Sequence, residues 1–545
     1  MITKITKRHL IGLSFIICHL SFSVALTSCS DWTDHYESGE GSEGGATTLW
    51  EQMKANAQLS DFCEVLEQTK VFRMHKKTSV SYADLLNSGQ SFTVVAPVNG
   101  KFDKQALLNQ VQTHKGDSVV EKTFVLNHIS RNLTPVTSSS RRMLMLNSKY
   151  AKVENGKISG VSMISTNLHA RNGVLHVASD QLPYMPNLYE LLCDDPQLSV
   201  IGECLRIYDE DYFDADASVS SGIVEGVPVY IDSVVIERNR LLERIGYIND
   251  EDSTYWMVVP TATGWQKAWD QAKEYFKYDE TVQKRDSIQR YYLTRALLDD
   301  AIFNETDQRS PQDSVVSVPY MYNLGLTPVG KPVYHVFQKP FEPKGIFYNA
   351  QKKECSNGIV YQTNEWPFTP EQAYLHPLWI EGEYAASLLI DEKDCTYNIR
   401  QENSDSISEH AFLQIVPEKN TSNWALTFRI NNFLSGNYDI YAVILPRHDD
   451  VDNGSKPCKF KAAINYVDEK GEAKTFDCGN QQFETDPNKK DSVLLAENFH
   501  FPTCNYGQPD IKASVKIFLA LASRESRNYS RQMYLDCIYL KPRRD

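Results

Sequence analysis

The residue with the clearest chemistry near the start of the chain is Cys29. It follows an apolar segment from Leu10 to Leu26, which itself comes after the basic side chains of Lys4, Lys7 and Arg8. A basic start, an apolar stretch of this length and small residues at its end are typical of a signal peptide rather than a membrane-spanning helix. A cysteine directly after the cleavage point offers its thiol for attachment of a lipid.

The sequence LTSC at 26–29 resembles a bacterial lipobox. The resemblance implies that residues 1–28 are a signal peptide and that Cys29 carries a lipid anchor after cleavage. The alternative interpretation is an ordinary secretory signal peptide followed by a cysteine without a special role.

The segment behind Cys29 is too polar to build a core. Residues 30–46 contain five acidic side chains, no lysine or arginine, and a Gly/Ser-rich end, so 29–46 is predicted to be a flexible tether. Acidic residues directly behind a lipidated cysteine also resemble the export signal of outer-membrane lipoproteins in Gram-negative gut anaerobes that live on glycans. That resemblance implies a lipid-anchored protein of the outer membrane, exposed at the cell surface.

The charge of the chain argues against a nucleic-acid partner. Its 545 residues carry a net charge of -14, and removal of residues 1–28, which hold three basic side chains and no acid, makes the balance about -17. Phosphate binding requires a clustered basic surface, which such a balance opposes. The length corresponds to about three domains.

The cysteines predict packing rather than a disulfide framework. Nine remain beyond Cys29, no CxxC pair occurs, and the spacings fit neither a zinc site nor a dense set of disulfides. Most are therefore expected to be small buried apolar residues, and one disulfide within the last third of the chain remains an open alternative. The nine are Cys63, Cys193, Cys204, Cys355, Cys395, Cys458, Cys478, Cys504 and Cys537.

Motifs that would indicate an enzyme are missing from the sequence. It contains no GxSxG, HExxH, GxxxxGK[ST] or strand-linked GxGxxG pattern, so we expect no catalytic, cofactor-binding or metal-binding residues. The acidic run 209–216 could offer oxygen ligands to calcium, but a solvated loop is the simpler interpretation. The run 449–454 has the appearance of a calcium loop with Val451 where an oxygen ligand is required, and we reject it.

The elements of the first folded segment are marked by local signals. Thr48 and Glu51 form a capping box in front of a helical pattern, and residues 91–97 form an apolar, β-branched strand that ends at a turn. Residues 124–129 are predicted to be a buried helix. Asn172 and Gly173 predict a tight turn that opens into another strand.

Three boxes in this segment, FTVVAPVNGKF at 92–102, LNHI at 126–129 and NGVLHV at 172–177, resemble the fasciclin-like domain in type and order. The resemblance implies an α/β domain over residues 47–187, with a usual role in adhesion or extracellular recognition. We expect the boxes to be structural, with Asn172-Gly173 in a turn and the two histidines holding backbone groups.

A diverged second copy is predicted over residues 188–372. Residues 188–192 repeat the opening helix, 255–265 the strand and turn, and 357–361 the closing box. No asparagine follows Pro260 in the expected turn, and the histidine of LNHI has no clear counterpart.

Residues 373–545 are predicted to form an all-β sandwich, because strand-length runs at 438–445, 515–521 and 533–540 are separated by polar loops. The segments 379–384, 435–441 and 534–540 resemble strands of galactose-binding-like jelly rolls, a fold shared by many carbohydrate-binding modules. Trp424 and Tyr506, near predicted loops, are the candidate sugar-binding residues, with core packing as the alternative.

The fold class is thus two α/β (α+β) fasciclin-like domains followed by an all-β jelly-roll sandwich. We expect a non-catalytic surface lipoprotein that binds a glycan or docks to an outer-membrane nutrient transporter, because it resembles accessory lipoproteins of SusC/SusD-type uptake systems. The alternatives are a cell or matrix adhesion protein acting through the fasciclin-like domains, and an unrecognised glycan hydrolase.

Overall fold

The computed structural model describes residues 45–73, 76–137, 139–224, 227–304, 312–318, 320–322, 331–446, 456–479 and 482–544. The predicted signal peptide, Cys29 and most of the predicted tether lie outside these ranges. In the described ranges, no helix combines the length and apolar character needed to cross a membrane. The chain divides into two compact units, residues 1–184 and 185–545.

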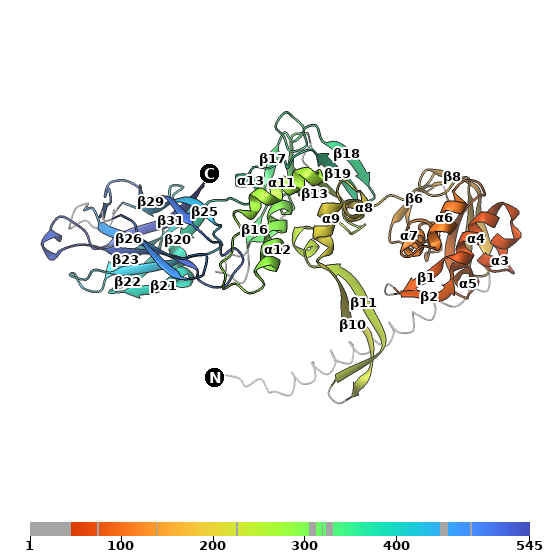
Figure 1. The fold of residues 1–545 in the computed structure, drawn as a ribbon, viewed down its shortest axis with the longest axis horizontal. Coiled ribbons are helices and arrows are strands. Elements are labelled where there is room, and N and C mark those ends of the chain that lie inside the picture. The colour runs from red at the N-terminus through yellow and green to blue at the C-terminus, as the bar shows by residue number, and fades with distance from the viewer. Residues whose placement is uncertain are drawn as a thin grey trace, which may run out of the picture. The chain divides into compact units, whose positions relative to one another are not determined.

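The first unit, here called the N-terminal body, is a mixed α/β fold (Figure 1). Its elements are α3 (Leu49–Ala55), η1 (Ala57–Leu59), α4 (Ser60–Gln68), β1 (Lys70–Arg73), β2 (Lys76–Ser81), α5 (Tyr82–Leu86), β3 (Phe92–Pro97), α6 (Lys104–Val111), α7 (Gly116–Val120), η2 (Glu121–Val125), η3 (Leu126–His128), β4 (Ile129–Ser130), β5 (Arg141–Leu144), β6 (Tyr150–Glu154), β7 (Lys157–Ile158), β8 (Val161–Ala170) and β9 (Gly173–Ala178). The sheet has the order β4-β3-β9-β8-β7-β6-β5, with β3 and β9 parallel.

Asn172 joins three segments of the N-terminal body. Its Oδ1 accepts a hydrogen bond from the backbone of Leu49 at 2.8 Å, and its Nδ2 donates to the carbonyls of Leu86 (2.9 Å) and Ser88 (2.8 Å). Gly173 has φ +153°, and a Cβ added there would lie 2.0 Å from the Phe92 carbonyl oxygen. Packing therefore requires Asn172 and Gly173 at these two positions, in agreement with the tight turn predicted there.

The two histidines of the predicted boxes are fully buried and hold backbone groups. His128 Nδ1 donates to the Phe124 carbonyl at 2.7 Å, and its Nε2 accepts from Leu182 N at 2.9 Å. The predicted helix over 124–129 is partly wrong, because π and 3₁₀ turns end at His128 and Ile129 begins β4. The His128 ring takes the Phe124 carbonyl that an α-helix would give to a backbone amide.

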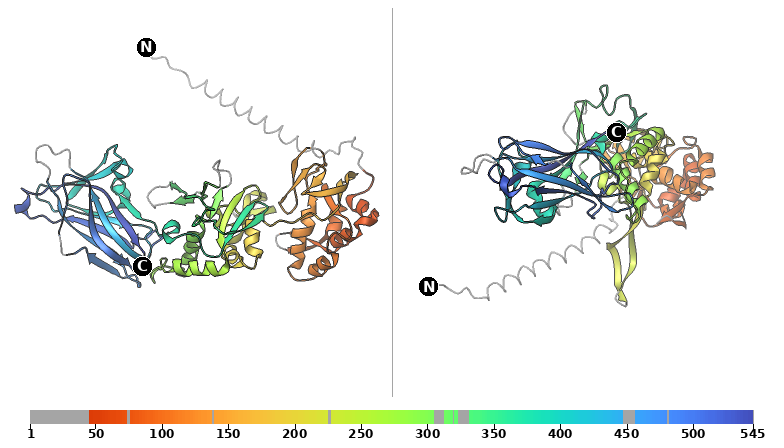
Figure 2. Two further views of the ribbon diagram at one scale, coloured as in Figure 1. Left: turned by 90° about the horizontal axis from the view of Figure 1, so that it is seen from above. Right: turned by 60° about the vertical axis from the view of Figure 1, so that its left-hand side comes forward.

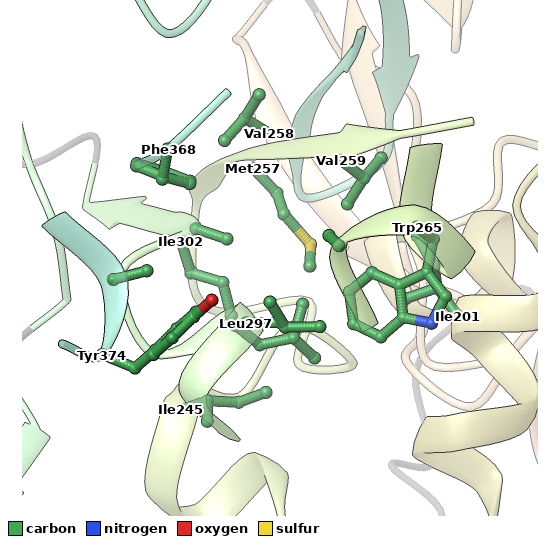
Figure 3. Close-up of a cluster of buried hydrophobic side chains, with 14 of the residues drawn as sticks. Ile201, Ile245, Met257, Val258, Val259, Trp265, Leu297, Ile302, Phe368 and Tyr374 are labelled. Atoms are coloured by element: carbon green, nitrogen blue, oxygen red, sulfur yellow. The ribbon is translucent and has the colours of Figure 1, made fainter. Parts of the chain in front are cut away.

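The middle body, residues 185–375, is a second mixed α/β fold with a four-stranded sheet in the order β13-β12-β19-β18. Its elements are α8 (Leu188–Asp194), α9 (Ser199–Arg206), β10 (Asp209–Val224), β11 (Val227–Asn239), α10 (Leu242–Ile245), β12 (Tyr255–Pro260), α11 (Ala262–Lys273), α12 (Arg285–Leu298), β13 (Ile302–Asn304), β14 (Ser314–Val316), β15 (Tyr320–Tyr322), β16 (Lys331–Val333), β17 (Val336–Gln338), β18 (Gln351–Cys355), β19 (Gly358–Thr363) and α13 (Pro370–Ala373). Figure 3 shows side chains of its core, where Met257 of β12, Trp265 of α11 and Leu297 of α12 meet.

The middle body repeats the asparagine arrangement of the N-terminal body. Asn357 Oδ1 accepts from Leu188 N at 2.9 Å, and its Nδ2 donates to the carbonyls of Ile248 and Asp250, both at 2.9 Å. Gly358 has φ +147°, and a Cβ there would lie 1.8 Å from the Tyr255 carbonyl oxygen. Strands β12 and β19 are parallel, as β3 and β9 are.

One element differs strongly between the two bodies. After the second helix, the N-terminal body has the short β1–β2 pair, whereas the middle body has the long antiparallel pair β10–β11. Figures 1 and 2 show this hairpin projecting from the middle body.

The sandwich, residues 376–544, consists of two sheets around one core. Its elements are β20 (Leu378–Glu381), η4 (Gly382–Tyr384), α14 (Ala385–Leu388), β21 (Leu389–Lys393), β22 (Cys395–Gln401), η5 (Ser408–His410), β23 (Ala411–Pro417), β24 (Ala425–Ile430), β25 (Gly436–Ile444), β26 (Lys459–Val467), β27 (Ala473–Asp477), β28 (Phe483–Glu484), β29 (Asp491–Phe501), β30 (Ala513–Leu519), η6 (Ser523–Glu525) and β31 (Met533–Arg543). Sheet H has the order β22-β23-β31-β25-β29 with β20 paired to β31, and sheet I has the order β21-β24-β30-β26-β27 with β28 paired to β26. The prediction of several folded parts that combine sheets and helices is confirmed.

The sandwich and the middle body share buried contacts and form one unit. Leu434 and Cys504 of the sandwich belong to the core of the middle body. Tyr278 OH donates to the Tyr506 carbonyl at 2.8 Å, and Lys512 pairs with the fully buried carboxylate of Asp279 at 3.1 Å. Removing the sandwich would therefore expose part of the neighbouring core.

Candidate functional site

The two aromatic residues proposed from the sequence are both engaged in packing contacts, Trp424 fully buried and Tyr506 partly buried. Trp424 is fully buried, and its Nε1 donates to the Arg531 carbonyl at 2.7 Å. Tyr506 packs between the rings of Phe276 and Tyr292, with centroids 5.6 and 5.4 Å away. Both side chains therefore pack against the protein core, which was the alternative interpretation of these two residues.

The acidic run 209–216 is not a loop. It begins β10, where Asp209 accepts from Tyr189 OH and Glu210 pairs with Arg238 and Arg240. Successive strand residues point to opposite faces, so these carboxylates do not converge on one ion. The solvated-loop interpretation is therefore wrong, and the hairpin pairing is the reason.

Aromatic side chains gather instead on the outer face of sheet H. Ile380, Ile440 and Ile538 face the core, so Trp379, Tyr441 and Tyr539 point outward. They are cross-strand neighbours, because Trp379 pairs with Tyr539 and Tyr539 with Tyr441.

The three rings form a stacked row. The centroids of Trp379 and Tyr539 are 4.2 Å apart with 29° between the planes, and those of Tyr539 and Tyr441 are 6.0 Å apart with 28°. Trp379 ends the row on β20 and is 51% exposed. An exposed, laterally supported indole is a platform for an apolar or amphipathic ring.

Polar side chains continue this face beyond the row. Asp439 of β25 pairs with Arg543 of β31 at 2.8 Å, and Asn437 Oδ1 lies 2.7 Å from His500 Nδ1. Planar groups with defined orientation can bind hydroxyl groups of a ligand that lies on the rings.

A pocket of about 520 Å³ lies at the other end of the face. Leu413 and Leu535 face the core, so their neighbours Phe412 and Tyr534 point outward and form its apolar floor, with centroids 5.5 Å apart. Charged residues, including Arg400 and Lys489, complete its lining.

A cluster that could hold a metal ion adjoins the aromatic row. The ligand atoms of Glu381, Asp536 and Cys537 lie within 4.8 Å of one another. Asp536 is fully buried and accepts from Ser408 N at 3.1 Å and from Lys490 Nζ at 2.7 Å. Carboxylate oxygens are the ligands that Ca²⁺ prefers.

Glu383 is a further acid near this cluster, two residues after Glu381. Both of its carboxylate oxygens are buried and have no hydrogen-bond partner on another described residue. Burial, together with the charges of Glu381, Glu409 and Asp536, raises the pKa of Glu383 to about 7.

Neither the aromatic row nor the acidic cluster was predicted from the sequence. Their residues lie on strands that are far apart in the chain and meet only through sheet pairing. The signal present in the sequence was the alternation of aromatic and core residues in β20, β25 and β31.

All nine cysteines are free thiols. Eight are buried, and Cys204 is partly exposed, as expected for small apolar residues. Burial raises the pKa of the Cys63 and Cys395 thiols to about 11.

Comparison with known proteins shows distant likeness only. No protein-family model and no curated protein matches the chain. Among solved structures, the CBM22–GH10 modules of the Clostridium thermocellum xylanase 10B match at 10% identity over 31% of this chain and 28% of that one, with a TM-score of 0.21. The chain therefore spans less than two thirds of that structure.

Two further structures match nearly their whole length. The C-terminal family 22 carbohydrate-binding module of the same xylanase is 12% identical over 31% of this chain and 96% of its own, with a TM-score of 0.21. A FAS1 domain pair from the insect cell adhesion molecule Fasciclin I is 12% identical over 53% of this chain and 93% of its own, with a TM-score of 0.20.

Proposed function

We propose that this chain is a non-catalytic recognition protein whose sandwich binds a glycan across the outer face of sheet H. The observation that carries the proposal is the row Trp379–Tyr539–Tyr441, which ends in a half-exposed indole. Sugar rings have apolar faces that stack on aromatic rings and hydroxyl edges that bind planar polar groups, and this face offers both.

The proposed location is the cell surface. Cys29 would carry the lipid, residues 30–46 would form the tether, and a SusC/SusD-type transporter complex would be the partner that receives the glycan. The support for this step is the resemblance of the N-terminal sequence to a lipobox and an export signal.

The N-terminal and middle bodies are proposed to be a fasciclin-like pair. The support is the sequence boxes together with the repeated asparagine arrangement, in which Asn172 and Asn357 make the same three kinds of hydrogen bond. Along the chain, the pair would link the proposed tether to the sandwich.

Adhesion through the middle body is the second candidate function. The long β10–β11 hairpin favours it, because Tyr212 and Ile236 form a cross-strand pair near its base and are both exposed. Exposed apolar pairs on a projecting hairpin are typical of a protein-binding surface.

Affinity electrophoresis and glycan arrays with residues 29–545, carrying Cys29→Ala, test the proposal. Trp379→Ala should weaken binding at least tenfold, while the control Tyr348→Ala, which removes a similarly exposed ring from the middle body, should not. Absence of binding to every glycan, or equal loss in both variants, would contradict the proposal. Release of sugar products from the same panel would instead favour a hydrolase.

A second arm tests adhesion without removing the sandwich. Shortening β10–β11 to the length of β1–β2 should leave glycan binding unchanged. If the shortened chain lost attachment to cells or matrix while the Trp379→Ala variant kept it, the adhesion function would be favoured.

A further inference from the structure

The pocket at the end of sheet H differs in charge from the rest of the chain. Among the described residues, its lining contains three cations, Arg400, Lys489 and Lys490, and one acid, Glu402. Two of the cations have acidic partners outside the lining, because Lys490 pairs with Asp536 at 2.7 Å and Lys489 with Asp486 at 3.5 Å. The protein as a whole carries a net charge of -14. The groups that line the pocket itself are thus more positive than negative, and cations that face a ligand attract anionic groups.

The cations are held in different ways. Lys490 is anchored, because it pairs with the buried Asp536 at 2.7 Å and donates to the Ser406 carbonyl. Arg400 donates from Nε to Gln414 Oε1 at 2.9 Å, and Gln414 Nε2 donates in turn to Tyr534 OH at 3.4 Å. This chain orients the Arg400 guanidinium and leaves its terminal NH₂ groups able to bind a planar anion.

The floor of the pocket is apolar. Phe412, Ile407, Leu445 and Tyr534 form a small cluster separate from the sandwich core. A volume of about 520 Å³ lies within the range of roughly 300–1,000 Å³ for small-molecule sites. A single sugar ring that stacks on this floor would bring a charged substituent to the cations at the rim.

We propose that this pocket binds the anionic group of an acidic glycan, a uronate carboxylate or a sulfate, so that the ligands of the chain are acidic polysaccharides. The inference rests on the proposed function, because the same polysaccharide would continue along the face to Trp379. Tyr534 and Tyr539 lie on the same strand, about 16 Å apart at roughly 3.3 Å per residue. The pocket therefore selects the charge, and the aromatic row binds the rest of the polymer.

Matched pairs of polysaccharides test the inference. Polygalacturonate is compared with its methyl ester, and chondroitin sulfate with desulfated chondroitin, by isothermal titration with residues 29–545 carrying Cys29→Ala. At least one anionic member should bind tenfold or more tightly than its matched partner, with an affinity that falls as NaCl rises. Which pair shows the difference distinguishes a carboxylate from a sulfate ligand.

The double variant Arg400→Gln, Lys489→Gln should remove this preference and leave binding of the neutral member unchanged. The control Arg527→Gln, Lys419→Gln removes two exposed cations elsewhere on the sandwich. It should change neither the preference for the anionic member nor the binding of the neutral member. Equal thermal midpoints of the variants exclude a folding effect.

The outcomes separate the two proposals. Binding that depends on Trp379 but shows no preference for the anionic members overturns the anionic pocket and keeps the proposed function. Binding that depends on Arg400 and Lys489 but not on Trp379 keeps the pocket and overturns the aromatic platform. Absence of binding to every member of the panel overturns both.

Discussion

The indole of Trp379 lies against the phenol ring of Tyr539, with ring centroids 4.2 Å apart, although the two residues stand at opposite ends of the sandwich sequence. The contact exists because β20 and β31 are paired with Trp379 opposite Tyr539. Tyr539 is therefore a support that keeps an exposed indole in one orientation, and pre-organisation of this kind reduces the entropy lost on binding.

The packing of the Tyr539 ring against Trp379 can be tested separately from any role of the Tyr539 hydroxyl. Tyr539→Ala should weaken glycan binding about two- to tenfold, since each immobilised side chain costs roughly 0.5–1.5 kcal/mol of ordering. Tyr539→Phe keeps the ring and should bind as the parent does. The measurement is isothermal titration, and equal losses in both variants would assign the effect to the hydroxyl.

Trp424 should behave in the opposite way to Trp379. Trp424→Ala leaves a cavity in the sandwich core and an unpaired Arg531 carbonyl, so we expect a loss of about 3–5 kcal/mol in the free energy of unfolding. Trp379→Ala removes a half-exposed ring and should cost less than about 1.5 kcal/mol. Urea unfolding followed by circular dichroism checks both, and comparable losses would contradict the assignment of the two rings.

Asn172 and Asn357 occupy equivalent positions in the N-terminal and middle bodies, so replacing either one should lower the stability of its own body. Asn172→Ala and Asn357→Ala each remove a side chain that makes three hydrogen bonds, and we expect each to lower the free energy of unfolding by at least about 2 kcal/mol. Hydrogen exchange should show that Asn172→Ala affects the N-terminal body and Asn357→Ala the middle body. The control is Asn109→Ala, at an exposed position of α6 where the asparagine side chain contacts the exposed Gln105. Small effects at both positions would show that water replaces the lost groups.

Calcium should stabilise the sandwich in a pH-dependent way. The pKa of Glu383 is raised from 4.5 to about 7, so its contribution to stability is full below pH 4.5 and is lost as the pH rises through 7. Ca²⁺ would replace the proton, so it should raise the melting temperature at pH 8 and have little effect at pH 5. Differential scanning fluorimetry with Ca²⁺, Mg²⁺ or EDTA measures this.

The Glu383→Gln variant is the control for the calcium effect. It keeps the size of the side chain and removes its charge, so it should be more stable than the parent at pH 8 without Ca²⁺ and should not respond to Ca²⁺. If Ca²⁺ raised the melting temperature of this variant as much as that of the parent, the ion would bind elsewhere.

Replacement of Cys29 tests the anchor. Cys29→Ala should release the protein from the membrane fraction and leave its melting temperature unchanged, because only the lipid is lost. Ultracentrifugation of cell lysates followed by immunoblotting is the measurement, with Cys63→Ala as a control for loss of a thiol. A Cys29→Ala protein that stayed in the membrane fraction would refute the lipid-anchor hypothesis.

Local patterns of the sequence predicted much of the secondary structure. The strand predicted within 255–265 is observed as β12 (Tyr255–Pro260), and the capping box of Thr48 and Glu51 is present. These features depend on neighbours within a few residues, whose preferences are local. Predictions failed where a distant partner decided the conformation, as in 209–216, whose pairing with β11 makes it a strand.

The sequence by itself determined which residues alternate, cap and turn, and these local patterns predicted elements such as the helix behind Thr48 and the strand that ends at Pro97. The close approach of the Phe92 and Tyr255 carbonyls, which requires Gly173 and Gly358, was decided by the tertiary structure. Only the tertiary structure decided which aromatic residues reach the surface. Trp424 and Trp379 are the same residue type in the same kind of strand-rich sequence, yet one is enclosed between two sheets and the other ends a row on an outer face. Exposure depends on which strands pair and which faces pack, and pairing between β20 and β31 joins residues that no local pattern relates.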